Sequence, residues 1–181
     1  MSCTSSRTLH GLPFECTPAR PGVEKIYLAQ YGDLMPVVDA DLDSASAMTV
    51  TSISSGITWY GYELPKNTAS LESPMTVADD GRVTYANTIS MQFNRLEAKK
   101  HAELAAIAQG YVMALVVDKA GRVWFVGYDE YLAPTDGNAM TGASASDRNG
   151  YDLTIVAESA YLPFEVPASV FEGITKVEPS V

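Results

Sequence analysis

The sequence predicts a mainly β (α+β) fold in which one helix packs on a largely antiparallel sheet. Three neighbouring features carry this prediction: an alternating stretch over residues 82–93, a helical repeat that follows it, and two β-rich runs within residues 112–126. The other elements are expected to be arranged around this stretch.

Residues 82–93 alternate between two kinds of side chain. This period of two is typical of a strand that buries one face and exposes the other. Asn87 is the one polar member of the inward set, which is Val83, Tyr85, Asn87, Ile89, Met91 and Phe93.

The pattern then changes to that of a helix. Asn94 is a good N-cap, and Glu97 stands where it can complete a capping box. Gly110 is a natural stop. The helix is predicted to lay one apolar stripe on the sheet, formed at i, i+3, i+4 and i+7 by Leu104, Ile107, Ala108 and Tyr111.

The segments after the helix indicate more strands. Residues 112–117 are apolar at every position, which favours a central strand, and residues 118–121 turn the chain back into 123–126. A last long strand is expected where Tyr151, Leu153, Ile155 and Ala157 alternate with other residues. A short edge strand is expected near Ile174.

The segments before the central stretch are also predicted from their composition. We expect an irregular N-terminal arm over residues 1–22 and one β-rich domain over residues 23–181. Within that domain the patterns predict a strand at 25–29, a hairpin formed by 48–53 and 57–64, and a strand at 68–73.

Composition limits the function. The chain has 181 residues, 46% of them hydrophobic, and a formal charge of −10 from 12 basic and 22 acidic residues. Dispersed basic residues argue against a nucleic-acid-binding surface. No run reaches the roughly 20 apolar residues that a membrane span needs, and the start of the chain lacks the apolar core of a signal peptide. We therefore expect a soluble protein made in a cytoplasm, a setting that favours free thiols at Cys3 and Cys16 over a disulfide between them.

Residues 129–149 form a candidate functional segment. A connection of this length far exceeds the usual 2 to 6 residues and is typical of a functional or disordered loop. We predict a projecting assembly arm that becomes ordered against a neighbouring copy. Its candidate residues are Asp129, Tyr131, Pro134, Asp136, Met140, Asp147, Arg148 and Asn149.

Other patterns do not support a catalytic, cofactor or metal site. Asp39, Asp41 and Asp43 begin like a calcium-binding loop, but the glycine and the final glutamate of that loop are missing. Residues 142–146 lack the last glycine of a nucleophile elbow. His10 and His101 have no partner in the sequence pattern. We expect no enzyme, no cofactor and no metal ion.

The aromatic residues have two interpretations. Trp59 and Trp124, together with neighbouring tyrosines, have the spacing of cross-strand core pairs, and this is the favoured interpretation. The other is an exposed binding face formed by Trp59, Tyr60 and Tyr62, with Tyr85 as a further candidate.

Several segments together resemble virion proteins of tailed bacteriophages that infect Bacteroides-type gut bacteria. The most specific one is the small-residue run into Asp147-Arg148-Asn149-Gly150-Tyr151; the others are residues 26–29, 62–71, 82–110, 117–121 and 141–142. The order of sheet, helix, sheet and long hairpin arm is also similar to the tail-tube fold.

The resemblance implies an antiparallel β-sandwich or barrel that forms hexameric rings stacked around a DNA channel in the virion tail, assembled in the cytoplasm of the bacterial host. The implied partners are further copies of the chain and other virion tail proteins, while genomic DNA passes without specific binding. An acidic wall suits this because it does not attract a polyanion. Two alternatives remain: a head-to-tail or baseplate ring component, and a carbohydrate- or receptor-binding β-sandwich module.

Overall fold

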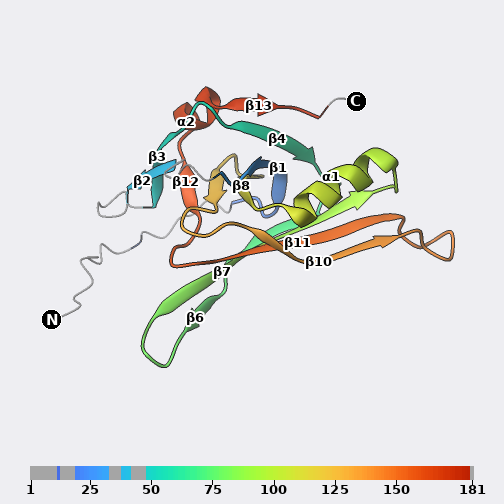
Figure 1. Ribbon diagram of the computed structural model, residues 1–181, viewed down its shortest axis with the longest axis horizontal. Coiled ribbons are helices and arrows are strands. Elements are labelled where there is room, and N and C mark those ends of the chain that lie inside the picture. The colour runs from blue at the N-terminus through green and yellow to red at the C-terminus, as the bar shows by residue number, and fades with distance from the viewer. Residues whose placement is uncertain (1–11, 13–18, 33–37, 42–47, 180–181) are drawn as a thin grey trace.

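Two sheets form the body of the protein in this computed structural model, which describes residues 12, 19–32, 38–41 and 48–179 (Figure 1). The larger described sheet has eight strands, in the order β13-β4-β1-β8-β9-β12-β3-β2. Their bounds are β1 (Val23–Gln30), β2 (Val38–Asp41), β3 (Thr49–Ile53), β4 (Thr58–Glu63), β8 (Val112–Asp118), β9 (Val123–Val126), β12 (Phe164–Val166) and β13 (Thr175–Val177).

The second described sheet has five strands. Four follow the order β10-β11-β7-β5, and the fifth, β6, pairs with β7 beyond the end of β5. Their bounds are β5 (Ala69–Glu72), β6 (Met75–Val77), β7 (Val83–Asn94), β10 (Ala133–Met140) and β11 (Gly150–Ser159). Two helices, α1 (Ala98–Gln109) and the short α2 (Ala168–Gly173), complete the described part of the fold.

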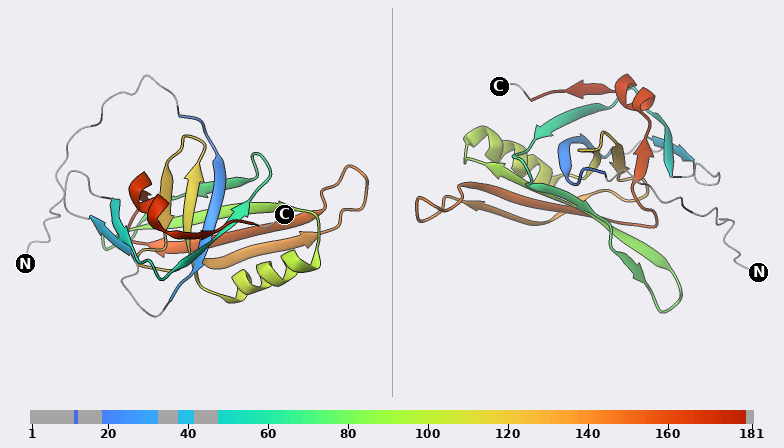
Figure 2. Two further views of the ribbon diagram at one scale, coloured as in Figure 1. Left: turned by 90° about the horizontal axis from the view of Figure 1, so that it is seen from above. Right: turned by 180° about the vertical axis from the view of Figure 1, so that it is seen from behind.

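The eight-stranded sheet curls strongly. β3 and β4 stand five strand-to-strand steps apart in it, which is about 24 Å in a flat sheet. Only residues 54–57 connect them, and a connection of that length reaches at most about 18 Å. The two ends of the sheet therefore have to approach each other, as the curved ribbon in Figure 2 shows.

The curl creates two hydrophobic cores. The inner face of the curled sheet packs around Trp59, Phe125 and Phe164. Its outer face packs against the five-stranded sheet around Ile89, Met91 and other residues of both sheets. The fold is thus mainly β, as predicted, and its sheets are curled.

β1 and β8 take part in both cores. Ile26 and Leu28 of β1 face the core between the sheets, whereas Tyr27 and Ala29 face the interior of the curl. In β8, Ala114 faces the core between the sheets and Met113 faces the interior of the curl, and their neighbours alternate in the same way. This confirms the prediction that residues 112–117 form a central strand.

The predicted hairpin of residues 48–53 and 57–64 is wrong. Both segments are strands, but β3 pairs with β2 and β12, while β4 pairs with β1 and β13. Composition indicates that a segment is extended, and it does not identify its partner. The strands predicted at 25–29, 68–73, 123–126 and 151–158, and the edge strand near Ile174, are confirmed.

The helix starts later than predicted. β7 continues through Asn94, which pairs with Gly150 of β11, and Arg95 then takes a left-handed φ of 65°. Glu97 occupies the N-cap position without a side-chain cap, so the predicted Asn94 capping box is wrong. Long-range strand pairing here prevails over a local helix signal.

The helix stripe is narrower than predicted, and the expectation of a single helix is wrong because α2 is also present. Ile107 is buried and Leu104 packs against the same core. Ala108 is exposed, and Tyr111 lies beyond the end of the helix with 55% of its surface exposed.

Ile107→Ala should destabilise the protein by about 2–5 kcal/mol, because it empties a buried site between α1 and the sheets. Asn94→Ala should cost less than about 0.5 kcal/mol, because the exposed Asn94 contributes its backbone carbonyl to Lys100 and no helix cap. Denaturant unfolding of both variants measures this. Equal losses would mean that α1 is not held by its packing.

Candidate assembly interface

The segment 129–149 is a hairpin strand and its turn, and the expectation of an irregular loop is wrong for its middle part. β10 pairs with β11 from Ala133 opposite Val156 to Met140 opposite Gly150. The strand was missed because residues 133–140 show no apolar alternation. An edge strand of this kind is held mainly by backbone hydrogen bonds.

β10 is the terminal strand of its sheet, so one of its edges has no partner strand in the described part of the chain. Residues 135–139 are exposed, and the hairpin extends past α1 (Figure 2). Pro134 and the register shift between Pro134 and Asp136 interrupt this edge near its root. The Asp136 carboxylate accepts a hydrogen bond from the Gly137 N–H (2.9 Å).

The start of the segment is anchored to the body. The Asp129 carboxylate accepts hydrogen bonds from the Ser159 hydroxyl and from the Ala160 N–H (2.8 Å). The ring centroids of Tyr131 and Tyr111 lie 4.0 Å apart. The electrostatic interaction with Tyr111 raises the pKa of Tyr131. Asp129 and Tyr131 therefore fix the root of the hairpin and do not project.

The turn at the tip is closed by Asp147. Its carboxylate accepts hydrogen bonds from the N–H groups of Ala143 and Ser144, both at 2.8 Å, and these bonds lower the pKa of Asp147. Gly142 has a φ of +73°, and a Cβ there would lie 2.7 Å from the Asp147 Cβ. The small-residue run thus forms a defined turn.

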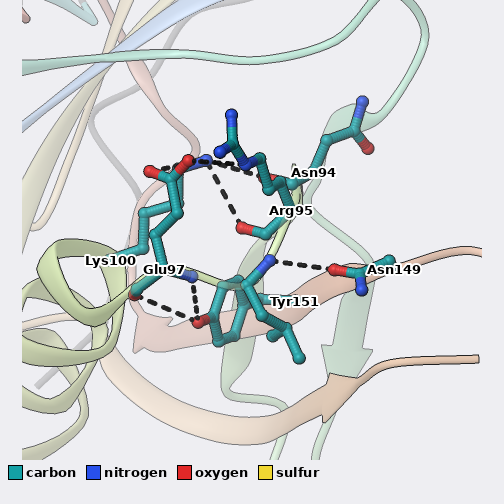
Figure 3. A network of polar contacts seen from close by, with 7 residues as sticks. Asn94, Arg95, Glu97, Lys100, Asn149 and Tyr151 are labelled. Carbon is teal, nitrogen blue, oxygen red and sulfur yellow. Dashed lines mark hydrogen bonds and ion pairs between the residues drawn. The ribbon is translucent and has the colours of Figure 1, made fainter.

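The residues after Asp147 connect the hairpin to the junction of β7 and α1. Arg148 donates to the Asp152 carboxylate (2.7 Å) and to the Tyr151 carbonyl (2.6 Å). The Asn149 side-chain oxygen accepts the Leu96 N–H (2.9 Å), and its backbone carbonyl accepts the Arg95 N–H (2.9 Å). Figure 3 shows the contact of Asn149 with this junction from close by.

Gly150 and Tyr151 complete the same connection. Neither is among the candidate assembly residues, although both belong to the segment that carries the resemblance to phage virion proteins. A Cβ on Gly150 would lie 2.0 Å from the Phe93 carbonyl oxygen, so only glycine fits. The buried Tyr151 hydroxyl lies 3.3 Å from the Glu97 nitrogen and 3.4 Å from its oxygen (Figure 3). The alternation of apolar residues along β11 predicted that Tyr151 faces the core. It did not predict that the Tyr151 hydroxyl contacts the backbone of Glu97, where α1 begins.

The other candidate sites do not assemble. Asp39 and Asp41 belong to strand β2, and Asp43 lies outside the described residues, as do Cys3, Cys16 and His10. Within residues 12, 19–32, 38–41 and 48–179, no group of three or more His, Cys, Asp or Glu residues could hold a metal ion. His101 is exposed, with its ring edge-on to that of Tyr151.

The aromatic residues divide between core and surface. Trp59 is fully buried, which confirms its core position and removes it from the proposed binding face. Tyr60 and Tyr62 line a cavity of about 390 Å³ beside α1. The Tyr62 hydroxyl donates to the Glu103 carboxylate (2.5 Å), and burial together with this bond raises the pKa of Tyr62 well above its ordinary value.

Neither helix in the described part of the chain has the length and apolar character to cross a membrane.

Comparisons of the chain with protein-family models, with curated proteins and with solved structures find no match.

Gly150→Ala should destabilise the protein by about 3 kcal/mol or more, because its methyl group would meet rigid backbone of β7. Gly137→Ala on the same hairpin is the matched control, because a Cβ there has its nearest contact at 3.5 Å. Thermal unfolding compares the two. A small effect of Gly150→Ala would argue against the close contact between β11 and β7.

The turn should loosen in acid through Asp147. Its folded-state pKa lies below the ordinary value of 3.8, so the hydrogen bonds are fully present above about pH 4 and are lost as the pH falls through the lower folded value. An NMR titration should show the Ala143 and Ser144 amide signals moving together in that range. Asp147→Asn should abolish the transition, and an unchanged titration in that variant would exclude Asp147 as its source.

Proposed function

We propose that this protein is a structural subunit of a tailed-bacteriophage virion, a tail-tube protomer that self-assembles into stacked rings around a DNA-conducting channel. The observation that carries this proposal is the open edge of β10 on a projecting, firmly rooted hairpin. The resemblance of the Asp147–Tyr151 segment to phage virion proteins supports the same function.

The hairpin is suited to assembly because its root is fixed to the body while its outer strand, β10, has an unpaired edge in the described part of the chain. Its root is fixed to the β7–α1 junction by Asn149, Gly150 and Tyr151. Its outer strand leaves backbone groups available for a strand of a neighbouring copy, a mode of binding known as β-augmentation. Because the root is already fixed, a neighbour can bind without first ordering a flexible loop. Ordering such a loop would cost about 1–2 kcal/mol per residue.

Charge supports the channel function. The chain carries a formal charge of −10. A ring of such subunits repels the phosphate backbone, so genomic DNA can pass through without specific binding. Other tail proteins would bind the two ends of the tube.

Two alternatives have less support. A head-to-tail or baseplate ring component would use the same hairpin, and it differs in position along the virion. A carbohydrate- or receptor-binding module would use the cavity beside Tyr60 and Tyr62. The buried Trp59 reduces that aromatic face, and Glu103 at the cavity is already bonded to Tyr62.

Negative-stain electron microscopy of the purified protein should show rings or tubes. Asn138→Pro and Ala139→Pro form a matched pair, because along an edge strand adjacent N–H groups alternate between the paired and the open side. The variant that loses the open-side N–H should keep its circular dichroism spectrum and form no tubes.

The other proline variant serves as the control, because it removes a bond between β10 and β11 and should lower the melting temperature. Normal tubes from both variants would exclude β10 augmentation as the assembly contact. Isolated protomers from the wild-type chain at all concentrations would count against the tube function itself.

A further inference from the structure

The projecting hairpin carries an Asp-Gly pair whose two reactive groups lie next to each other. Asp136 and Gly137 are both exposed in β10, and the Gly137 N–H donates a hydrogen bond to the Asp136 side-chain oxygen (2.9 Å). The amide nitrogen therefore lies close to the carboxyl carbon that carries this oxygen. These are the two atoms that become bonded when an aspartyl side chain cyclises onto the following amide.

The surroundings of this pair leave the backbone free to react. Glycine has no Cβ to obstruct the nitrogen, and it permits a wide range of backbone angles. The register of β10 against β11 shifts between Pro134 and Asp136, and β10 has a partner strand on one side only among the described strands. A terminal strand beside such an irregularity opens at lower free energy than a central strand.

The sequence contains two more pairs of this kind, Asp80-Gly81 and Asn149-Gly150, and the first has its reactive groups bonded elsewhere. The Asp80 carboxylate accepts hydrogen bonds from the backbone N–H (3.1 Å) and the side chain (2.6 Å) of Arg82. The Gly81 N–H donates to the Ala78 carbonyl (2.8 Å). The nitrogen and the carboxylate are thus held apart.

The Asn149-Gly150 pair is fixed from both sides. The Asn149 side-chain oxygen accepts the Leu96 N–H (2.9 Å). Gly150 belongs to β11 and pairs with Asn94 of β7 on one side and with Met140 of β10 on the other. Its backbone cannot turn toward the preceding side chain without separating these strands.

We propose that Asp136 is a self-modification site, at which attack by the Gly137 nitrogen converts aspartate to isoaspartate. The nitrogen forms a bond to Cγ of the protonated carboxyl group, and the Cγ–OH bond breaks. The hydroxyl leaves with the proton of the nitrogen as one water molecule, and a cyclic succinimide remains.

A second water molecule opens the ring. Its attack at Cγ restores aspartate. Its attack at the Asp136 backbone carbonyl carbon breaks the bond of that carbon to the Gly137 nitrogen, and the chain then runs through Cγ as isoaspartate. One water molecule leaves and one is added, so the reaction uses no oxidant, reductant or cofactor and the mass of the chain is unchanged.

The product has one additional backbone atom at position 136. This addition shifts the later backbone groups of β10 against β11, while the cores are unaffected because residues 135–139 are exposed. The consequence for assembly rests on the proposed function. An isomerised copy no longer presents the regular edge to which a neighbouring strand adds, so isomerisation removes aged, unassembled subunits from tube formation.

Ageing of the purified full chain at neutral pH tests the reaction. Isoaspartate is quantified with isoaspartyl methyltransferase and located by fragmentation mass spectrometry. In the folded protein it should accumulate at Asp136 at least about tenfold faster than at Asp80 or Asn149, because small displacements of reacting atoms change rates by up to about a hundredfold.

The same measurement on the chain unfolded in denaturant separates structure from sequence. There Asn149 should react first, because ammonia leaves a side-chain amide more readily than water leaves a carboxyl group. An identical order of the three sites in the folded and unfolded chains would overturn the proposal. So would a rate at Asp136 that does not exceed the other two in the folded protein.

Two variants test the chemistry at this position. Asp136→Glu is the matched control, because it keeps the negative charge but could close only a larger ring, so isomerisation should stop. Asp136→Asn keeps the ring size and should react faster than the wild type, with release of ammonia. Equal isoaspartate formation in the wild type and in Asp136→Glu would exclude the attack by Gly137.

Electron microscopy of aged samples tests the consequence for assembly. Tubes from aged wild-type protein should exclude the chains that contain isoaspartate, whereas aged Asp136→Glu should assemble as the fresh variant does. An even distribution of isoaspartate between tubes and free chains would overturn the effect on the β10 edge. Absence of tubes from fresh wild-type protein would contradict the proposed function alone, because the isoaspartate measurement needs no assembly.

Discussion

The fold depends on two strands that have to be apolar on both faces. β1 and β8 lie side by side in the curled sheet, and each contributes alternate side chains to the core inside the curl and to the core between the sheets. A single polar residue within residues 26–29 of β1 or 112–116 of β8 would therefore enter a core, whichever way it pointed. The short connection between β3 and β4 keeps the sheet curled, and the curl in turn creates the inner core.

The second organising feature is the junction at which β7 ends and α1 begins. Arg95, Leu96 and Glu97 form hydrogen bonds with residues of the β10–β11 hairpin, more than 50 positions later in the sequence. At the exposed side, Glu97 forms ion pairs with Lys100 and with Arg95 (Figure 3). The same few residues thus define the helix start and the direction in which the hairpin projects.

The sequence allowed most strands to be predicted, because burial on one face leaves a period of two, as in Ile89, Met91 and Phe93. It allowed the β8–β9 pair to be predicted, because a short turn joins these two strands. It did not allow the partners of β3 and β4 to be predicted, since each of them binds a strand distant in the chain. β10 left no signal because Gly137 and Asn138 bury little side-chain surface. The prediction that Asn94 caps the helix was wrong because Asn94 instead pairs with Gly150 as the last residue of β7. Residues 129–149 were chosen as a candidate assembly segment because of their length.

β7 passes from a fully buried environment at Ile89 to an exposed one at Val83 within one continuous strand. Among the described strands, the pairing of Val83 and Thr84 joins this end of β7 only to the three-residue strand β6. Opening of that end breaks few contacts, whereas opening at Ile89 requires both sheets to separate. We therefore expect amide hydrogen exchange to be graded along this one strand, fastest near Val83 and slowest near Ile89.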